Sequence, residues 1–409
     1  MNYSHSWSEI KLYEERKLTQ ESRLRLFNVA DFKNLNHKTK NIQKFEKVPS
    51  RVMEAPKATT MEYRKLGKSG LEVSVIAYGD MGAQDNEENQ KKTNEIVNKC
   101  FEVGINYFDT AEGYGNGQHE LLLGRALKQC GKKREDYVVS TKIFLGTDKK
   151  TPNAQGNARK HLIEGLNASL KRLQLDYVDI VFSHRHDDDV PVEEVVFAFA
   201  QIIKEGKAFY WATSEWTPDQ IIEAMWVADK YGLPAPVAEQ NQYNLLHRQN
   251  QEVTLGYLFD KFGYGTTIWS PAAGGLLTNK YTEEDVDITG SRFQIPVVAK
   301  MVHYNEYFGP EKAKESQKKW KELLQIAKEL GTDNLSVLSL AWCIRNKEVS
   351  TVIAGLSKIQ YVEDAVKALE ISRKFTKETE ERINKLFPAP GGLNWKTRQP
   401  VADRRLGQY

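Results

Sequence analysis

From Met61 onward the chain alternates short apolar runs with longer segments in which apolar residues recur at helical spacing. A short run rich in β-branched and aromatic residues is typical of a strand buried in a parallel sheet, and the longer periodic segments predict amphipathic helices. Eight runs predict strands: 73–78, 105–108, 137–140, 177–182, 208–212, 237–239, 266–269 and 351–353. Helices are predicted between them, for example over 94–103, 162–173, 193–204, 218–231, 318–330, 336–345 and 362–369.

Strands that alternate with helices in this way predict a closed parallel barrel, because each right-handed crossover places its helix outside the sheet. The fold class predicted is therefore α/β, a (β/α)8 TIM barrel. Ahead of the first strand, residues 63–71 predict a β-hairpin with two short arms around a Gly-containing turn, and we expect it to cover the bottom of the barrel. The predicted organisation is an extension over 1–60, a barrel over 61–388 and a C-terminal tail over 389–409.

The extension over 1–60 differs in character from the rest of the chain. It is polar and carries 12 Lys and Arg against 7 Asp and Glu, a net charge of +5. Since the whole chain has 58 and 55 such residues, the remainder holds 46 and 48 and is nearly neutral, which gives no reason to expect nucleic-acid binding. Residues 8–27 fit a helix that starts at Ser8, and two interpretations stay open: a largely irregular solvated tail, or a docking segment for a protein partner.

Overall composition excludes several classes of protein. Hydrophobic residues make up 40% of the chain, which is enough for a sizeable core. Cys100, Cys130 and Cys343 have no short spacing, so the sequence supports neither a zinc knuckle nor a disulfide framework. No N-terminal apolar run resembles a signal peptide, and no apolar stretch is long enough to span a bilayer. We therefore expect a soluble cytoplasmic protein without membrane insertion.

Polar residues that can carry chemistry stand at the ends of consecutive predicted strands. Asp109 follows the second strand, Tyr114 lies in the loop after it, Lys142 ends the third strand and His184 ends the fourth. Because the carboxyl ends of barrel strands meet at one mouth, these four side chains should lie together. Taken alone, Lys142 would be interpreted as a surface lysine and His184 as a core histidine. Four such residues at the ends of successive strands instead favour a catalytic site.

These residue types suit the protonation of a carbonyl oxygen. A phenol has a reference pKa of about 10, and an ammonium group close by lowers it by stabilising the phenolate. Asp109 would keep Lys142 charged and fixed, while His184 would offer a hydrogen bond that orients a carbonyl group. The set therefore predicts general acid catalysis with Tyr114 as the donor.

A metal site is the competing interpretation of the same region. His184 and His186 form an H-x-H pair that Asp187, Asp188 and Asp189 follow, and imidazole with carboxylate can bind zinc. Such a site needs further histidines at other strand ends, and the remaining histidines are poorly placed for it. We therefore predict no metal, and a solvated loop or helix cap for the aspartates.

The motifs in order resemble those of the aldo-keto reductase superfamily, and in particular the branch that contains the voltage-gated potassium channel β subunits. The resemblance covers about residues 61–388. The motifs that carry it are N-Y-F-D-T-A-E-G-Y-G (106–115), S-T-K (140–142), the segment 159–182 that leads to H-R (184–185), W-A-T-S-E-W (211–216), E-Q-N-Q-Y-N-L-L (239–246), W-S-P-A-A-G-G-L-L-T-N-K-Y (269–281) and A-W-C-I-R-N (341–346).

The resemblance implies an NADPH or NADP cofactor that lies across the barrel mouth. It implies a catalytic tetrad of Asp109, Tyr114, Lys142 and His184. It implies cofactor contacts from Ser214 and Gln240 at the carboxamide, from Trp269, Ser270, Pro271, Gly275 and Lys280 along the pyrophosphate, from Ser291, Arg292 and Ser357 at the 2′-phosphate, and from Gly355, Gln360, Glu363 and Asp364 at the adenine end.

Two functions follow from the resemblance. The first is the NADPH-dependent reduction of small aldehydes or ketones. The second is a cofactor-binding subunit, weakly catalytic or inactive, of a larger assembly such as a potassium channel, with residues 1–60 reaching a protein partner. The channel branch also implies a homo-oligomer.

Some positions depart from the pattern of the channel β subunits. His184 stands where the animal channel subunits have Asn, which favours catalysis. Asp80 and Glu215 add anions near the cofactor path, Glu215 in place of an Arg, and therefore argue for weaker cofactor binding. Leu145 replaces a Trp, which widens the expected substrate pocket. Asp364 replaces an Asn, and the spacing from Ser357 to Glu363 is one residue short.

Overall fold

The structure is a computed structural model, and it describes residues 61–391 apart from 83, 149–150, 283–291, 295–298, 301–303 and 310. The described residues all belong to one unit of the chain, Lys57–Tyr409. The predictions made for the extension over 1–60, and those for the tail beyond residue 391, lie outside the described residues.

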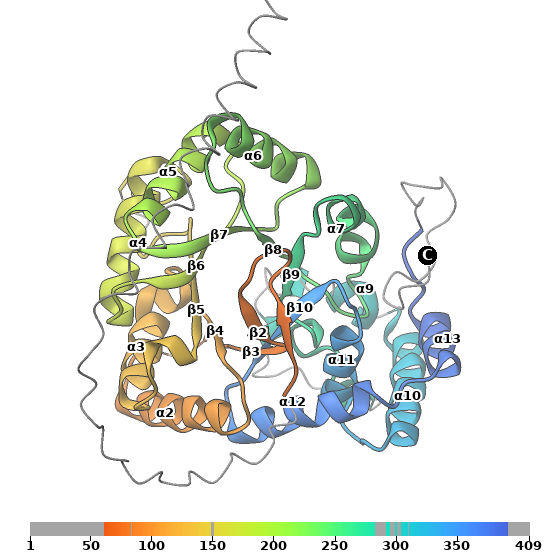
Figure 1. Ribbon diagram of the computed structural model, residues 1–409. Helices are drawn as coiled ribbons and strands as arrows, with labels where there is room; N and C mark the ends of the chain where they lie inside the picture. Colours follow the sequence, from red (N-terminus) through yellow and green to blue (C-terminus); the bar gives the residue numbers. More distant parts are fainter. Residues whose placement is uncertain are drawn as a thin grey trace, which may run out of the picture. The chain divides into compact units, whose positions relative to one another are not determined.

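Parallel strands close into a barrel in the order β10-β3-β4-β5-β6-β7-β8-β9 (Figure 1). The strands are β3 (Ile76–Gly79), β4 (Tyr107–Asp109), β5 (Val138–Ile143), β6 (Val178–Ser183), β7 (Ala208–Ser214), β8 (Ala238–Gln240), β9 (Gly265–Ile268) and β10 (Val349–Gly355). Each of the eight predicted runs overlaps one of these strands, so the predicted (β/α)8 barrel is confirmed. The first run was placed too early, because residues 73–74 belong to the hairpin.

Helices surround the barrel on its outer side (Figure 1). They are α2 (Glu87–Glu102), α3 (Gln118–Gln129), α4 (Arg159–Leu173), α5 (Val192–Lys204), α6 (Pro218–Tyr231), α7 (Gly256–Phe262), α9 (Tyr304–Phe308), α10 (Ala313–Leu330), α11 (Leu335–Ile344), α12 (Ile359–Ser372) and α13 (Lys377–Leu386). All the predicted helices are found, whereas α3, α7, α9 and α13 are not among the predicted ones. Within the part of the chain that the structure describes, no helix is both long and apolar enough to cross a membrane.

The limits of α6 show how local sequence sets a helix. Thr217 and Gln220 form a reciprocal capping box at its start, and Pro218 occupies the first turn, where a missing N–H costs nothing. Gly232 ends the helix in the left-handed conformation with φ 63°, which a residue without Cβ adopts readily.

The predicted hairpin is present and lies at the bottom of the barrel. Its strands β1 (Tyr63–Lys65) and β2 (Glu72–Ser74) pair antiparallel. Leu66 is fully buried and packs with interior residues of the barrel strands. The Arg64 guanidinium donates to the main-chain oxygens of Ile344 at 2.8 Å and Val349 at 2.6 Å, next to the start of β10. The hairpin therefore closes the end of the barrel opposite the mouth.

Close packing of α3 on α4 depends on Gly124. A Cβ at this position would come 2.3 Å from the main-chain oxygen of Leu173, at the end of α4. Gly124→Ala should therefore lower the free energy of unfolding by about 1–3 kcal/mol in urea titrations, despite the better helix propensity of alanine. Gly70→Ala is the matched control, since a Cβ there meets nothing within 4 Å and should leave stability nearly unchanged.

Candidate active site

The pleat of the strands decides which side chains reach the barrel mouth. Tyr107, Val138, Phe182, Ala212 and Ala238 all belong to the cluster that fills the barrel interior. Side chains two or four residues further along a strand lie on the same face. The inward positions at the upper ends of β4, β5, β7 and β8, and just beyond the end of β6, are therefore those of Asp109, Lys142, Ser214, Gln240 and His184.

Lys142 is the centre of a hydrogen-bonded cluster in this mouth. Its side chain is fully buried, and its ammonium group forms an ion pair with the Asp109 carboxylate. Nζ also donates to the main-chain oxygen of Thr110 at 2.8 Å and to the Tyr114 hydroxyl at 3.3 Å. The three ammonium hydrogens therefore have three acceptors. Burial alone would lower the pKa of Lys142, but the Asp109 charge, with help from Tyr114, outweighs it and raises the pKa above its usual value.

Asp109 is held from two other strands as well. Its Oδ1 accepts from Ser140 Oγ at 2.6 Å on β5 and from Gln240 Nε2 at 3.2 Å on β8. A buried ion pair is stable only when its remaining hydrogen-bonding capacity is satisfied, and here it is. The cluster therefore presents a fixed, charged lysine to the phenol.

Tyr114 is half-buried at the rim and is placed by a tight loop after β4. Gly115, Asn116 and Gly117 have φ angles of 58°, 56° and 84°, a left-handed run that folds the loop back toward the mouth. The ring lies edge-on to that of His184, with 5.9 Å between their centroids.

His184 follows β6 and is 5% exposed. Burial, with smaller contributions from the charges of Lys142 and Arg185, holds its pKa well below its usual range. The ring is therefore neutral at physiological pH. Its buried Nδ1 has no hydrogen-bond partner among the described residues.

Comparison with known proteins decides the family of this barrel. The model of the aldo/keto reductase family matches residues 75–387. The chain belongs to the aldo/keto reductase family. The resemblance seen in the sequence is thus confirmed.

Three curated relatives of this aldo/keto reductase carry names from the channel branch. A Schizosaccharomyces pombe protein named as a voltage-gated potassium channel β subunit is 43% identical over 326 residues, which cover 80% of this chain and 93% of the relative. Proteins of Oryza sativa subsp. japonica and Arabidopsis thaliana with the same type of name are 41% and 39% identical, over 79% and 80% of this chain and 95% and 97% of their own lengths.

The structure brings together the four side chains that were predicted to be catalytic in this aldo/keto reductase, and it places His119 and Arg185 beside them. His119 on α3 was set aside as poorly placed, yet its Nδ1 lies 2.9 Å from Thr110 Oγ1, and its ring lies edge-on to Tyr114 at 6.4 Å. Arg185 donates to Ser214 Oγ at 3.2 Å. The sequence signal that could have placed His119 near the site is its position five residues after Tyr114.

The side chains that the resemblance assigns to a cofactor differ in how far they are available to one. Ser214 Oγ is engaged with the main-chain oxygen of Gln240 at 3.0 Å. Ser270 Oγ accepts from the Gly274 amide at 2.8 Å, within the turn after β9 that also contains Pro271 and Gly275. Lys280 is exposed beyond that turn, and Gly355 and Ser357 are exposed at the end of β10. Ser291 lies outside the described residues, and for Arg292 only the backbone is described.

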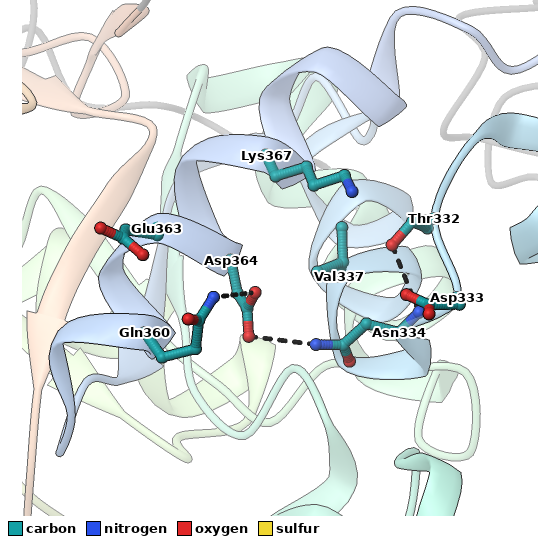
Figure 2. A pocket seen from close by; sticks show the side chains of 8 residues that line it. All are labelled: Thr332, Asp333, Asn334, Val337, Gln360, Glu363, Asp364 and Lys367. Atoms are coloured by element: carbon teal, nitrogen blue, oxygen red, sulfur yellow. Dashed lines mark hydrogen bonds between the residues drawn. The ribbon is translucent and has the colours of Figure 1, made fainter.

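Three of the residues expected at the adenine end line a pocket of about 430 Å³ between α11 and α12 (Figure 2). Its lining is Thr332, Asp333, Asn334, Val337, Gln360, Glu363, Asp364 and Lys367. Asp364 accepts from Asn334 Nδ2 at 3.0 Å and from Gln360 Nε2 at 3.1 Å, so this carboxylate is already partnered (Figure 2). Asn334, the N-cap residue of α11, also lines the pocket, and the sequence did not predict it as a site residue.

The side chains of the alternative metal interpretation have structural roles. His186 Nδ1 lies 2.8 Å from Asp188 Oδ1, and its ring is edge-on to Trp216. Asp187 accepts from the Asn157 amide at 2.8 Å. Among the described residues, no three or more His, Cys, Asp or Glu side chains form a group that could hold a metal ion.

The lowered pKa of His184 predicts a pH dependence of stability. An unfolded histidine titrates near pH 6.5, whereas the buried one stays neutral below that pH, so the unfolded chain binds more protons there. The free energy of unfolding should therefore fall as the pH drops below about 6.5, by up to about 1.4 kcal/mol per unit for this group. Urea titrations between pH 7.5 and 5.5 measure the slope.

His184→Asn is the matched variant for this dependence and should make the slope shallower. A residual slope of the same sign should remain, because burial also lowers the pKa of His119. A slope that His184→Asn leaves unchanged would contradict the assignment.

Proposed function

We propose that this aldo/keto reductase reduces the carbonyl group of a small aldehyde or ketone with NADPH, and that Tyr114 is the proton donor. The observation that carries the proposal is the 3.3 Å distance from Lys142 Nζ to the Tyr114 hydroxyl, with the same ammonium paired to Asp109. Stability alone does not explain a buried ion pair at this place, because replacing such a pair with hydrophobic residues of similar volume often leaves the free energy of unfolding unchanged. A role in chemistry at the neighbouring phenol explains it better.

The described residues fit an NADP-type dinucleotide. The pocket between α11 and α12 offers carboxylate and amide groups, among them Glu363 and Gln360, that suit the donors and acceptors of an adenine. Lys280 is an exposed cation beyond β9, on the side where phosphates would lie. Ser214 and Gln240 stand on neighbouring strands beside the tetrad and offer groups for a carboxamide.

NADPH would supply the hydride that goes to the carbonyl carbon. The Tyr114 hydroxyl would donate its proton to the carbonyl oxygen as negative charge grows there. Lys142 would stabilise the phenolate left behind, and Asp109 would keep the ammonium in place. A neutral His184 can donate to the same oxygen without adding a charge that repels Lys142. Leu145, which packs against Gly113 beside Tyr114, would border the substrate.

A second function is favoured by the names of the relatives. Proteins of three organisms that this chain matches over most of their length are named as potassium channel β subunits. In this alternative the barrel over 61–388 binds NADPH with little or no turnover. The basic segment 1–60 reaches a protein partner in a cytoplasmic assembly that includes further copies of the chain. Deletion of residues 1–60 separates the two functions: a reductase should keep its kinetics, whereas an assembly subunit should lose its partner.

Cofactor binding and turnover test the proposal directly. NADPH, then NADH, is titrated while the intrinsic tryptophan fluorescence is followed, and an aromatic aldehyde is then added while the cofactor absorbance is recorded. Tight binding of NADPH with steady oxidation supports the reductase. Tight binding without oxidation of any aldehyde or ketone favours the assembly subunit. Absence of binding contradicts both.

A further inference from the structure

The Glu215 side chain connects the ends of strands β7, β8 and β9 at the barrel mouth by hydrogen bonds. It directly follows Ser214 at the end of β7, and its Oε1 accepts from the main-chain amide of Gln242 at 2.7 Å and from the indole Nε1 of Trp269 at 2.7 Å. Both donors therefore converge on one oxygen, one from the segment after β8 and one from the residue after β9.

Glu215 is itself held firmly in an unfavourable backbone conformation. Its φ is 58°, a region that costs a residue with a Cβ of the order of 1 kcal/mol or more. Its amide donates to the main-chain oxygen of Gln240 at 3.2 Å, and the next amide, that of Trp216, donates to the buried Glu239 carboxyl at 3.2 Å. Strain that persists under such restraint indicates a position that has a role.

The segment that Glu215 holds is strained as well. We name Trp269–Gly275 the β9 wall. Within it Ser270 and Ala273, which carry a Cβ, have φ angles of 58° and 50°, whereas Gly274 and Gly275 adopt φ angles of 64° and 107° without strain. The main chain of Trp269 pairs with Asn241 and Tyr243, and its indole is tied only through Glu215 among the hydrogen bonds described. Loss of that tie would release the large side chain at the start of the wall.

We propose that Glu215 is a positioning residue that latches the β9 wall in the shape that receives the phosphates of the dinucleotide. The proposal rests on the proposed function, since the wall matters only if a dinucleotide binds along it. The latch depends on the oxygen as an acceptor and not on its negative charge. Glutamine offers the same acceptor, whereas arginine has donors only. The charge itself acts against anionic phosphates.

Substitutions of Glu215 separate the acceptor from the charge. Glu215→Gln keeps the acceptor, Glu215→Ala removes it, and Glu215→Arg removes it while adding a charge that attracts phosphate. Trp269→Phe removes the indole donor and leaves Glu215 in place. Glu223→Ala, at an exposed carboxylate on α6, is the matched control.

Hydrogen–deuterium exchange of the peptide 269–282 in the cofactor-free protein reads the latch directly. Glu215→Gln and the control should exchange as the wild type does. Glu215→Ala, Glu215→Arg and Trp269→Phe should exchange about tenfold faster, the effect of losing the hydrogen bond that holds the Trp269 indole. The double variant Glu215→Ala with Trp269→Phe should exchange no faster than Glu215→Ala alone, because the Trp269–Glu215 hydrogen bond is already lost in that single variant. Unchanged exchange in Glu215→Ala would overturn the latch.

Calorimetric titration with NADPH then gives the second readout. Glu215→Gln should bind at least as tightly as the wild type, and Glu215→Arg about tenfold more weakly despite its favourable charge. Tighter binding by Glu215→Arg would overturn the proposal in favour of a purely electrostatic role. If the wild type fails to bind NADPH, the proposed function fails, while the exchange experiment still decides whether the latch exists.

Discussion

Tyr114→Phe is expected to lower kcat for carbonyl reduction by about 10²- to 10⁴-fold, the usual contribution of a positioned general acid. The ring would still fill the rim and lie edge-on to His184, so the loop after β4 should keep its shape. Only the hydroxyl that lies 3.3 Å from Lys142 Nζ would be lost. Single-turnover kinetics with NADPH and an aromatic aldehyde, together with the dissociation constant of NADPH, measure the effect. The dissociation constant should stay within about threefold of the wild-type value.

Tyr231→Phe is the matched control for this loss of a hydroxyl. Tyr231 is 47% exposed at the end of α6, on the outside of the barrel, and its ring contacts Phe197. The control should retain the full rate. A Tyr114→Phe variant that keeps most of its rate would show that another group supplies the proton. A variant that loses NADPH affinity in parallel with its rate would show that Tyr114 acts in binding.

The residues that the sequence placed correctly are those governed by local pattern and strand order. Asp109, Lys142 and His184 could be found because a barrel brings the carboxyl ends of its strands to one mouth, and because alternate positions along a strand share a face. The pattern of short apolar runs gave the strands themselves, and the Gly-containing turn gave the hairpin.

The residues that escaped depend on contacts between distant segments. His119 is placed by α3, which lies directly after a glycine-rich loop where apolar spacing is hard to recognise. Asn334 meets Asp364 across two helices. Glu215 was seen only as an added anion, because nothing local shows that a tryptophan 54 positions later donates to it. Spacing along a chain does not encode such pairs.

Lys142→Met is expected to reduce both stability and activity. Asp109 is 2% exposed and would lose its counter-ion while it remains buried, which typically costs about 3–5 kcal/mol in the free energy of unfolding. Its hydrogen bonds from Ser140 and Gln240 would remain but could not replace a full positive charge. Urea titration at pH 7 measures the loss, and reduction of an aromatic aldehyde should fall by at least the factor expected for Tyr114→Phe, because the phenolate would lose its stabilising cation.

The double variant Asp109→Asn with Lys142→Met separates the two effects. It removes both charges, and a neutral pair of similar volume in place of a buried ion pair is often as stable as the pair itself. Its stability should therefore return to within about 2 kcal/mol of the wild type, a strong coupling between the two positions, while activity stays lost. If the two substitutions lower the free energy of unfolding additively, the loss in Lys142→Met does not come from breaking the ion pair with Asp109. Recovery of stability without recovery of turnover would mean that the buried charge serves the chemistry at Tyr114, since the fold itself would then do equally well without it.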